Sequence, residues 1–176
     1  MFMLRYSYIL RQPGFGGVMQ AFDQIAFRNA CGMFATGITI VTTLRPDGEP
    51  IGMTVNSFAS VSLDPPLILW SVGEHAYSYD VFKNTDYFAV HILRKDQEVL
   101  SNLFASRGED KFGGIEWSLG EFGSPILSEY AACFQCKTEH IYPGGDHKII
   151  VGRVMTFEDR GDQEALLFFR GRYHYV

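Results

Sequence analysis

The sequence has few cysteines, no long apolar run and no excess of basic residues. Three cysteines in 176 residues, an odd number, do not make a disulfide framework, which agrees with a reducing compartment. No segment approaches the roughly 18 consecutive apolar residues of a membrane span, and arginines interrupt the first residues too often for a signal peptide. A net charge of −5 offers no basic surface to nucleic acid or to an anionic membrane. We therefore expect a cytoplasmic protein with no nucleic-acid or membrane partner.

Motifs of several common cofactor sites are also missing. The sequence contains no phosphate-binding loop of the Walker type, and no glycine fingerprint of a Rossmann domain follows a first strand. His75, His91 and His140 form no metal-ligand spacing, so we expect no metal site. Cys133 and Cys136 spell C-x-x-C, but they fall within a strand-like run, and no second pair exists to complete a zinc site. We interpret them as ordinary strand cysteines on opposite faces.

Apolar and aromatic residues are plentiful, at 47% and 15% of the chain, which is enough to fill the core of one domain. We expect that domain to occupy residues 19–176. Residues 1–18 are expected to form an N-terminal extension that is either flexible or the product of a misassigned start, with Met19 as the true first residue.

Hydrophobic periodicity predicts a mainly β chain with three helices. Helices are expected over residues 23–35, where Asp23 is the candidate N-cap, over 75–85 and over 97–106. Strands are expected over residues 38–44, 50–55, 67–72, 87–93, 131–142, 148–158, 165–169 and 173–176. Such mainly antiparallel strands close most economically into a small barrel, because closure removes unpaired edges.

The most informative stretch spans residues 52–67, where a β-type run breaks into small hydroxyl and amide residues and restarts after two prolines. We call this stretch the polar ledge. Its side-chain donors and acceptors are Thr54, Asn56, Ser57, Ser60 and Ser62. We expect that some of the neighbouring backbone amides are not used in strand pairing. Such groups suit the polar edge of a flat heterocycle or a ribityl chain. From the pattern alone, a serine-rich turn between two strands is an equally good interpretation.

Two further motifs accompany the polar ledge, namely Gly145-Asp146-His147 and, near the end of the sequence, Gly171-Arg172-Tyr173-His174. Together the three segments resemble the short-chain flavin reductases, the partners of two-component flavin monooxygenases. The resemblance covers about residues 22–175. It implies an FMN-binding split β-barrel of Greek-key type with a few short helices, which forms a homodimer and binds flavin at the subunit interface.

The resemblance also implies an activity, the reduction of FMN or FAD by NAD(P)H, with the reduced flavin handed to a separate oxygenase. Because no Rossmann domain is present, the nicotinamide would bind in the flavin's own pocket. Three alternatives stay open at this point. They are a protein that retains FMN and passes electrons directly to another acceptor, a flavin- or heme-binding module without turnover, and a barrel used only for dimerisation.

The resemblance places the flavin against the polar ledge and the end of the neighbouring strand. The residues expected to hold the ring are Thr54, Val55, Asn56, Ser57, Ser60, Ser71 and Val72. Those expected on the phosphate side are Ser78, Phe104, Ala105, Arg107, Lys111 and Phe112. Taken alone, residues 107–111 favour a solvated charged turn, and Glu74 is an acidic departure from the family pattern near the expected phosphate.

His147 is the side chain that we expect to position the nicotinamide, by hydrogen bonding or stacking rather than as a general base. Gly145 lets the backbone bend close to a ligand, and Asp146 can orient the imidazole. Asp146 and His147 are thus the candidate catalytic residues. Tyr173 is expected close to the flavin or the nicotinamide, although its ring suits a core position equally well.

Overall fold

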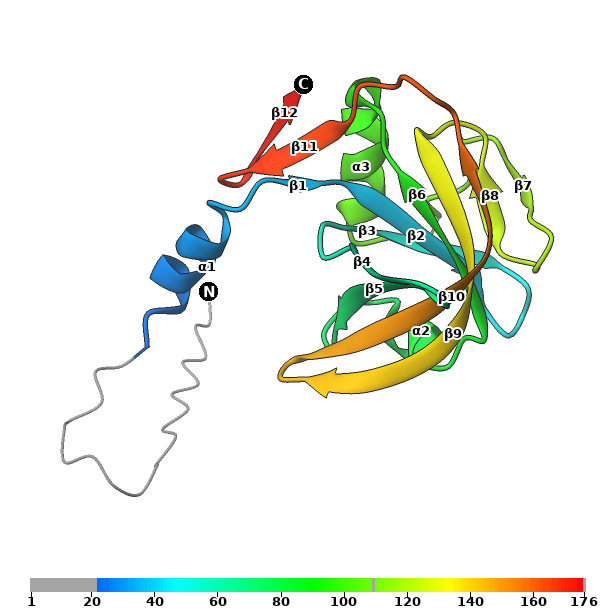
Figure 1. Ribbon diagram of the computed structural model, residues 1–176, viewed down its shortest axis with the longest axis horizontal. Coiled ribbons are helices and arrows are strands. Elements are labelled where there is room, and N and C mark those ends of the chain that lie inside the picture. Colours follow the sequence, from blue (N-terminus) through cyan, green and yellow to red (C-terminus); the bar gives the residue numbers. More distant parts are fainter. Residues whose placement is uncertain (1–21, 109, 176) are drawn as a thin grey trace.

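The structure, a computed structural model, describes residues 22–108 and 110–175, and the extension expected over residues 1–18 lies outside this part. The described chain has twelve strands, three short α-helices and one 3₁₀ helix (Figure 1). The prediction of a mainly β chain with a few short helices is confirmed. No described helix is long and apolar enough to cross a membrane.

Seven strands form the main sheet. In chain order they are β2 (Thr39–Leu44), β3 (Pro50–Val55), β4 (Ala59–Leu63), β5 (Pro66–Gly73), β6 (Tyr87–Ile92), β9 (Ala132–Gly144) and β10 (His147–Asp159). Their spatial order is β3-β2-β6-β9-β10-β5-β4, and every neighbouring pair is antiparallel. The two edge strands, β3 and β4, follow one another along the chain and are joined by residues 56–58. The polar ledge therefore connects the two edges of the curved sheet (Figure 1).

The polar ledge is less of a loop than its sequence predicts. Residues 59–63 form β4, which pairs with β5 through a bulge between Ser60 and Ser62. Alternate residues of β5, namely Ile68, Trp70 and Val72, are buried, as the period of two requires. The Trp70 ring meets the ring of Phe82 edge-on at 4.9 Å between centroids. This packing fixes the strand against which the turn of the ledge lies.

The N-terminal helix α1 (Gln24–Cys31) begins where its sequence predicts. The Asp23 carboxylate accepts hydrogen bonds from the backbone N–H groups of Ile25 and Ala26, at 2.9 and 3.0 Å, so the predicted N-cap is confirmed. The helix ends at Cys31, four residues before the predicted end at residue 35. Helix α3 (Glu98–Ala105) lies within the predicted range 97–106 and follows the 3₁₀ helix η1 (Lys95–Gln97).

The helix predicted over residues 75–85 is wrong for most of its length. Only α2 (Tyr79–Phe82) is helical, and Phe82 is its one buried residue. Before it, the N–H of Ala76 donates to the Gly73 carbonyl and that of Tyr79 to the Ala76 carbonyl, each at 3.0 Å. These are successive tight turns, and they leave Tyr77 exposed at a cavity wall instead of on a helix.

A separate group of elements extends from the main sheet (Figure 1). We call this group the arm, and it comprises α1 and a sheet of β1 (Thr36–Gly37), β11 (Leu166–Phe169) and β12 (Arg172–Tyr175), with β11 in the centre. The N–H of Arg170 donates to the Gly32 carbonyl at 2.9 Å and ties the sheet to α1. No residue of α1 is buried in this chain. The apolar face of the predicted helix therefore has no core of its own chain to cover.

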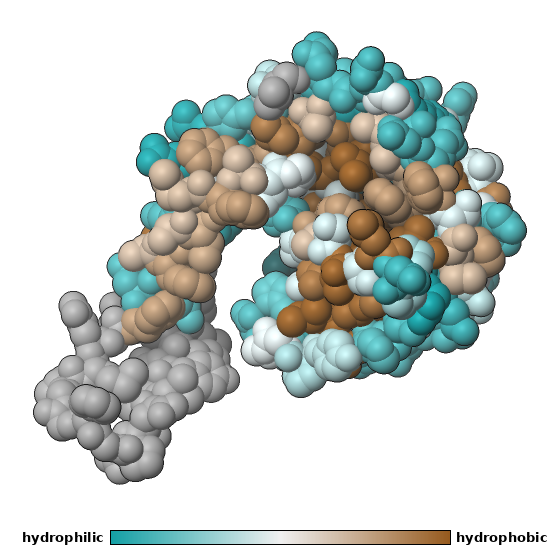
Figure 2. All heavy atoms as spheres, viewed as in Figure 1, coloured by the Kyte–Doolittle hydropathy of each residue, from teal (hydrophilic) through white to brown (hydrophobic). Residues whose placement is uncertain are grey.

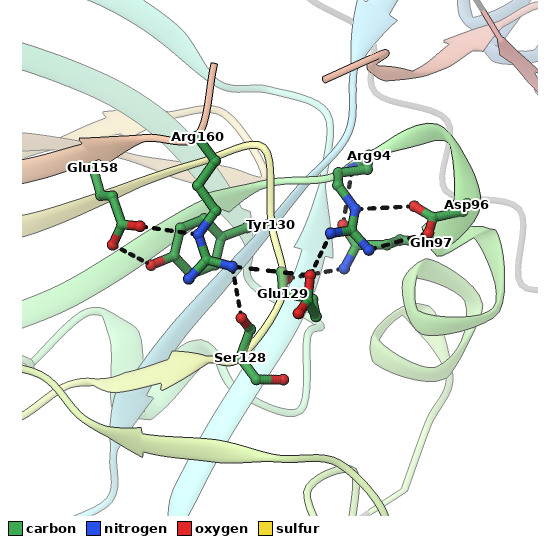
Figure 3. A network of polar contacts seen from close by, with 8 residues as sticks. All are labelled: Arg94, Asp96, Gln97, Ser128, Glu129, Tyr130, Glu158 and Arg160. Carbon is green, nitrogen blue, oxygen red and sulfur yellow. Dashed lines mark hydrogen bonds and ion pairs between the residues drawn. The ribbon is translucent and has the colours of Figure 1, made fainter. Parts of the chain in front are cut away.

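Strands β7 (Trp117–Leu119) and β8 (Pro125–Leu127) form a small sheet, and an ionic network follows β8 (Figure 3). Arg94 contacts both Asp96, at 3.1 Å, and Glu129. The Arg160 guanidinium lies 3.8 Å from the centroid of the Tyr130 ring, and both side chains bond to the Glu158 carboxylate. The network fastens β10, β8 and η1 to one another.

Candidate functional site

The turn of the polar ledge is held by one pair of serines. The Ser57 hydroxyl accepts a hydrogen bond from the Ser71 N–H at 3.0 Å and donates to the Ser71 carbonyl at 3.3 Å. Because Ser71 belongs to β5, these contacts fix the turn to the main sheet. Asn56 is exposed, and residues 56–58 belong to no strand. Backbone amides outside a ladder and an exposed carboxamide are the groups that a planar ring with alternating donors and acceptors can use.

Hydroxyl groups link the polar ledge to the arm through α3. The Thr54 hydroxyl donates to the Ser101 carbonyl at 2.7 Å, and the Ser101 hydroxyl lies 2.9 Å from that of Tyr173. The Tyr173 hydroxyl donates to the Asn102 carboxamide at 3.1 Å. Because a hydroxyl has one proton to donate, the Ser101 hydroxyl is the donor to Tyr173. Thr54 and Tyr173, which the sequence proposes as ligand contacts, are thus joined through one turn of α3.

A cleft of about 200 Å³ lies between β3 and the end of α3, and we call it the cationic cleft. The residues proposed from the sequence that line it are Thr54, Ser78, Phe104, Ala105, Arg107, Lys111 and Phe112. Gly52 allows the close packing of α3 on β3, since a Cβ atom there would lie 2.7 Å from the Phe104 ring and 3.1 Å from the Val41 carbonyl. A larger residue would force the wall of the cleft to shift.

Lys111 supplies charge inside the cationic cleft. Its ammonium group donates to the carbonyls of Phe104 and Gly52, at 2.7 and 3.5 Å, and burial lowers its pKa. Both partners are neutral, and an ammonium group has three donors, so one N–H remains for a further acceptor. A half-buried cation held by carbonyls alone favours an anionic ligand, because the ligand's charge would offset the cost of burial.

A larger cavity of about 1040 Å³ lies between the polar ledge and the arm, and we call it the arm cavity. Figure 2 shows this hollow, with apolar residues on both of its sides. The residues proposed from the sequence that line it are Thr54, Val55, Asn56, Ala105 and Tyr173. Thr54 and Ala105 also line the cationic cleft, so the two spaces adjoin.

The Gly145-Asp146-His147 motif forms the turn between β9 and β10. His147 pairs with Gly144 across the hairpin, which leaves Gly145 and Asp146 as a two-residue loop, and Gly145 has a φ of +74°. The His147 Nδ1 atom lies 2.7 Å from the Asp146 carboxylate, and this contact lowers the pKa of Asp146. The imidazole rests against Gly73 of β5, where a Cβ atom would lie 3.3 Å from its Nε2 atom. The ring is therefore oriented by both neighbours while about half of it stays exposed.

Comparison with known proteins identifies the family. The model of the flavin reductase like domain matches residues 31–176. This chain is a member of that family. An FMN reductase (NADH) of Agrobacterium fabrum is 45% identical over 148 residues, covering 84% of this chain and 83% of the relative. The reductase component of a flavin-dependent trigonelline monooxygenase of Acinetobacter baylyi is 40% identical over 156 residues, covering 88% of this chain.

Solved structures of flavin reductase-like proteins share the fold. The NADH:FAD oxidoreductase of Streptomyces globisporus, in complex with NAD and FAD fragments, superposes with a TM-score of 0.83 at 39% identity. The match covers 88% of this chain and 93% of that one. Among the curated relatives, however, the chain spans only about half the length of some, 50% of the Acinetobacter baylyi protein and 49% of a probable flavin reductase of Rhizobium meliloti.

In this flavin reductase-like chain the proposed site residues fall into two groups. The first group consists of the residues given above as lining the cationic cleft or the arm cavity. The second group lies outside both cavities: Ser71 is on β5, Ser57 is hydrogen-bonded to it, and Gly145, Asp146 and His147 lie at the β9–β10 turn. His147 pairs with Gly73, and Gly73 lies two residues along β5 from Ser71, about 7 Å at strand spacing. The Val72 side chain is fully buried in the core, so only its backbone could face a ligand, and Ser60 is exposed on the edge strand β4.

Several residues around the site were missed by sequence reasoning. Ser101 and Asn102 bind Tyr173, yet a serine or an asparagine within a helical pattern carries no signal of such a role. Arg45 and Tyr77 stand at the rim of the cationic cleft, where the Arg45 guanidinium lies 5.0 Å from the centroid of the Tyr77 ring. Arg45 belongs to a sequence that reads as a simple turn, and the wrong helix over residues 75–85 concealed Tyr77.

The C-x-x-C motif of this flavin reductase-like domain is structural. Cys133 and Cys136 lie on β9, are buried in different core clusters and form no disulfide. Burial raises the pKa of Cys133 to about 12 and raises that of Cys136 as well. The prediction of ordinary strand cysteines is confirmed. Within residues 22–108 and 110–175, no three His, Cys, Asp or Glu side chains gather as a metal site would require.

Proposed function

We propose that this protein is an NAD(P)H-dependent flavin reductase that reduces FMN or FAD. The observation that carries the proposal is the meeting of the cationic cleft and the arm cavity at the polar ledge, in a chain of the flavin reductase-like family. NADH is the expected donor, because the names of the Agrobacterium fabrum and Streptomyces globisporus proteins both include it.

The residues around the two cavities fit the parts of a flavin. The amides of residues 56–58 and the Asn56 carboxamide would hold the polar edge of the ring. Lys111 and Arg107 would bind the phosphate, and the half-buried Lys111 supports this role because its described hydrogen-bond partners are both neutral. Binding of a phosphate there would raise the lowered pKa of Lys111.

His147 would position the nicotinamide beside the flavin. Hydride transfer is chemistry that the two bound molecules supply between them, and the task of the protein is to align them and exclude water. Asp146 holds the His147 ring by its Nδ1 atom, so the Nε2 atom is the one available to a ligand amide. Asp146 and His147 are therefore proposed as positioning residues.

The functional unit would be a homodimer of split β-barrels with flavin at the subunit interface. The support comes from the arm, where Phe22, Ile25 and Phe34 are each more than 70% exposed in a single chain. Exposed apolar residues on this scale mark an interaction surface. Because the arm forms one wall of the arm cavity, a second copy packed on the arm would help to close the site.

The product would serve a separate enzyme. A relative that is the reductase component of a flavin-dependent monooxygenase supports an oxygenase as the consumer of reduced flavin. We propose that this handover takes place in the cytoplasm, in keeping with cysteines that form no disulfide in the described chain.

Anaerobic mixing tests the function directly. The purified protein is combined with excess FMN or FAD and then with NADH or NADPH, and the loss of absorbance of the oxidised flavin is followed. Bleaching of flavin well beyond the protein concentration is the expected result. Bleaching of one equivalent only would identify an FMN-retaining electron-transfer protein instead, and bound flavin that stays oxidised with both nucleotides would identify a binding module.

A further inference from the structure

Two hydroxyl groups of the site donate their protons to helix α3. The Thr54 hydroxyl donates to the Ser101 carbonyl at 2.7 Å, and the Tyr173 hydroxyl donates to the Asn102 carboxamide oxygen at 3.1 Å. A hydroxyl has one proton, so neither group can donate a second hydrogen bond in this arrangement. Both side chains line the arm cavity, and towards its interior they can act only as acceptors.

Ser101 and Asn102 create this polarity from outside the two spaces. Neither is among the described residues that line the cationic cleft or the arm cavity. The Ser101 side chain is fully buried, and its hydroxyl donates to that of Tyr173 at 2.9 Å. The Tyr173 oxygen therefore accepts one hydrogen bond from α3 and donates one to it, while the Phe168 ring packs edge-on against the tyrosine ring at 5.5 Å between centroids. The position of the hydroxyl and the direction of its proton are thus both fixed before a ligand arrives.

The two acceptors stand where a bound flavin would change from ring to phosphate. Thr54 lines both the arm cavity, on which Asn56 presents its carboxamide to the ring, and the cationic cleft, in which Lys111 would bind the phosphate. The part of a flavin between ring and phosphate is the ribityl chain, and its hydroxyl groups can donate hydrogen bonds. The ring carbonyls and the phosphate, by contrast, are acceptors, and they would find no donor at Thr54 or Tyr173.

We propose that Asn102 is a positioning residue which, together with the Ser101 carbonyl, presets Tyr173 and Thr54 as acceptors for the ribityl hydroxyls. The inference rests on the proposed function, because it takes the flavin ring and phosphate to lie in the two adjoining spaces. Preset acceptors favour binding because neither side chain has to exchange a partner or be reoriented when the ligand arrives. Without the Asn102 oxygen, the Tyr173 proton would be free to turn towards the cavity, and the hydroxyl would no longer be fixed as an acceptor.

Paired dissociation constants for two ligands test the proposal. The ligands are FMN and an analogue in which an unsubstituted pentyl chain replaces the ribityl chain, so that only the hydroxyl groups are lost. Kd is measured by fluorescence titration, and the unmodified protein is expected to bind FMN at least about tenfold more tightly, as neutral hydrogen bonds to two acceptors would give. In Asn102→Ala the affinity for FMN should fall about fivefold, while the affinity for the analogue changes less than about twofold.

Two further variants separate the direction of the proton from packing. Asn102→Asp keeps an acceptor oxygen for the Tyr173 proton, so it should retain the ratio of the two affinities. Asn84→Ala removes another exposed asparagine, which donates to the Asp80 carbonyl at 2.8 Å and lines neither space, and it should leave both constants unchanged. Equal affinities in the unmodified protein, or equal losses for both ligands in Asn102→Ala, would overturn the proposal. A ratio that falls as far in Asn102→Asp as in Asn102→Ala would also overturn it.

The ribose hydroxyls of NADH are donors of the same kind, so the KM for NADH is also measured at saturating FMN. This KM should change less than about twofold in Asn102→Ala. A rise of about fivefold, with the preference for FMN over the analogue unchanged, would assign the two acceptors to the nicotinamide cofactor and overturn their assignment to the ribityl chain. Failure of the unmodified protein to bind FMN or FAD would reject the proposed function itself, which is a different outcome from equal binding of FMN and the analogue.

Discussion

His91 has a protonation state that the backbone around it dictates. The side chain is fully buried on β6, with Nδ1 at 3.1 Å from the Ile40 carbonyl and Nε2 at 3.2 Å from the Leu127 N–H. A carbonyl can only accept and a backbone N–H can only donate, so the proton lies on Nδ1 and the ring is neutral. The ring thus joins β2 to β8 across β6, and protonation would cost the bond to Leu127.

This geometry makes the stability depend on pH. Burial lowers the pKa of His91 from 6.5 to about 4. Between these values the unfolded chain binds the proton and the folded chain does not, so the stabilisation is complete above about pH 6.5 and is lost as the pH falls towards 4. We expect the free energy of unfolding to drop by roughly 3 kcal/mol from this group over that interval. Urea unfolding at pH 7 and at pH 4.5 measures the loss.

Two variants distinguish the contribution of His91 to this pH dependence from that of carboxylates, which titrate in a similar pH range. His91→Asn removes the titrating group and should reduce the dependence of the unfolding free energy on pH, although it lowers stability at pH 7. His140→Asn alters an exposed histidine on β9 and should retain the full dependence. An unchanged slope in His91→Asn would show that other groups cause the acid sensitivity.

His147 gives the prediction closest to the chemistry. His147→Ala removes one hydrogen bond or stacking contact to the nicotinamide, worth about 1 kcal/mol, so the KM for NADH should rise about fivefold. The Kd for flavin should stay nearly constant, because the His147 imidazole lies at the β9–β10 turn and does not line the cationic cleft. Steady-state kinetics at saturating flavin and a separate flavin titration measure the two quantities.

The matched control for this experiment is His140→Ala on β9, the other strand of the same hairpin, which should change neither value. A loss of flavin binding in His147→Ala would move His147 to the flavin side. A fall in kcat with an unchanged KM would mean that the imidazole acts on the hydride step and not on binding.

For single residues, the sequence predicts polar contacts at positions where a polar residue interrupts a regular strand pattern. Thr54 and Asn56 stand out because they end a β-type run, and both line the arm cavity. Ser101 and Arg45 could not be found in this way, because a serine in a helix and an arginine beside a turn are ordinary surface choices. Their positions depend on which elements pack together, and local sequence does not contain that information.

Among the elements, the β9–β10 hairpin depends most on a single turn. Gly145 has a φ of +74°, which an L-residue with a side chain adopts only at a cost of about 1–2 kcal/mol. We expect Gly145→Ala to lower the free energy of unfolding by about 1 kcal/mol and to raise the KM for NADH, since His147 directly follows the turn. Chemical denaturation measures the loss of unfolding free energy, and the m value should stay unchanged.

Gly114→Ala is the control for this substitution. No atom lies within 4 Å of its ideal Cβ position, and its φ is outside the region that strains a side chain. The same change of residue type should therefore be nearly neutral there. If the two alanine variants lose equal stability, the positive φ of Gly145 is not the cause.

The sequence predicts poorly those elements whose structure depends on packing or pairing with other elements of the fold. Residues 75–85 have helix-forming composition, yet only Tyr79–Phe82 is helical, because Phe82 must reach Trp70 while Tyr77 faces a cavity. Strand β4 was read as part of a turn, and its pairing with β5 gives it order that its serines do not indicate. The strands with regular alternation or β-branched runs, such as β2 and β6, could be predicted almost to the residue.

For the whole molecule, the sequence predicts amphipathic segments but not what covers them. Hydrophobic periodicity predicts the helix α1, yet in the structure none of its residues is buried. The main sheet meanwhile ends at β3 and β4, and the space beside their connection is bounded by the arm. A single chain therefore leaves both the arm and the wall of the site incomplete, which is the reason for proposing a second copy.

Phe34 offers the sharpest test of that second copy. Its side chain is 78% exposed in one chain and lines the arm cavity, so Phe34→Glu should leave the fold of the single chain intact and destabilise a dimer by placing a charge in an apolar interface. Light scattering should give the mass of two chains for the unmodified protein and that of one chain for the variant, with weaker flavin binding. Leu119→Glu, on the exposed strand β7, is the control and should keep the mass of two chains. If the unmodified protein has the mass of one chain and still reduces flavin, the arm has another role and the site needs no second copy.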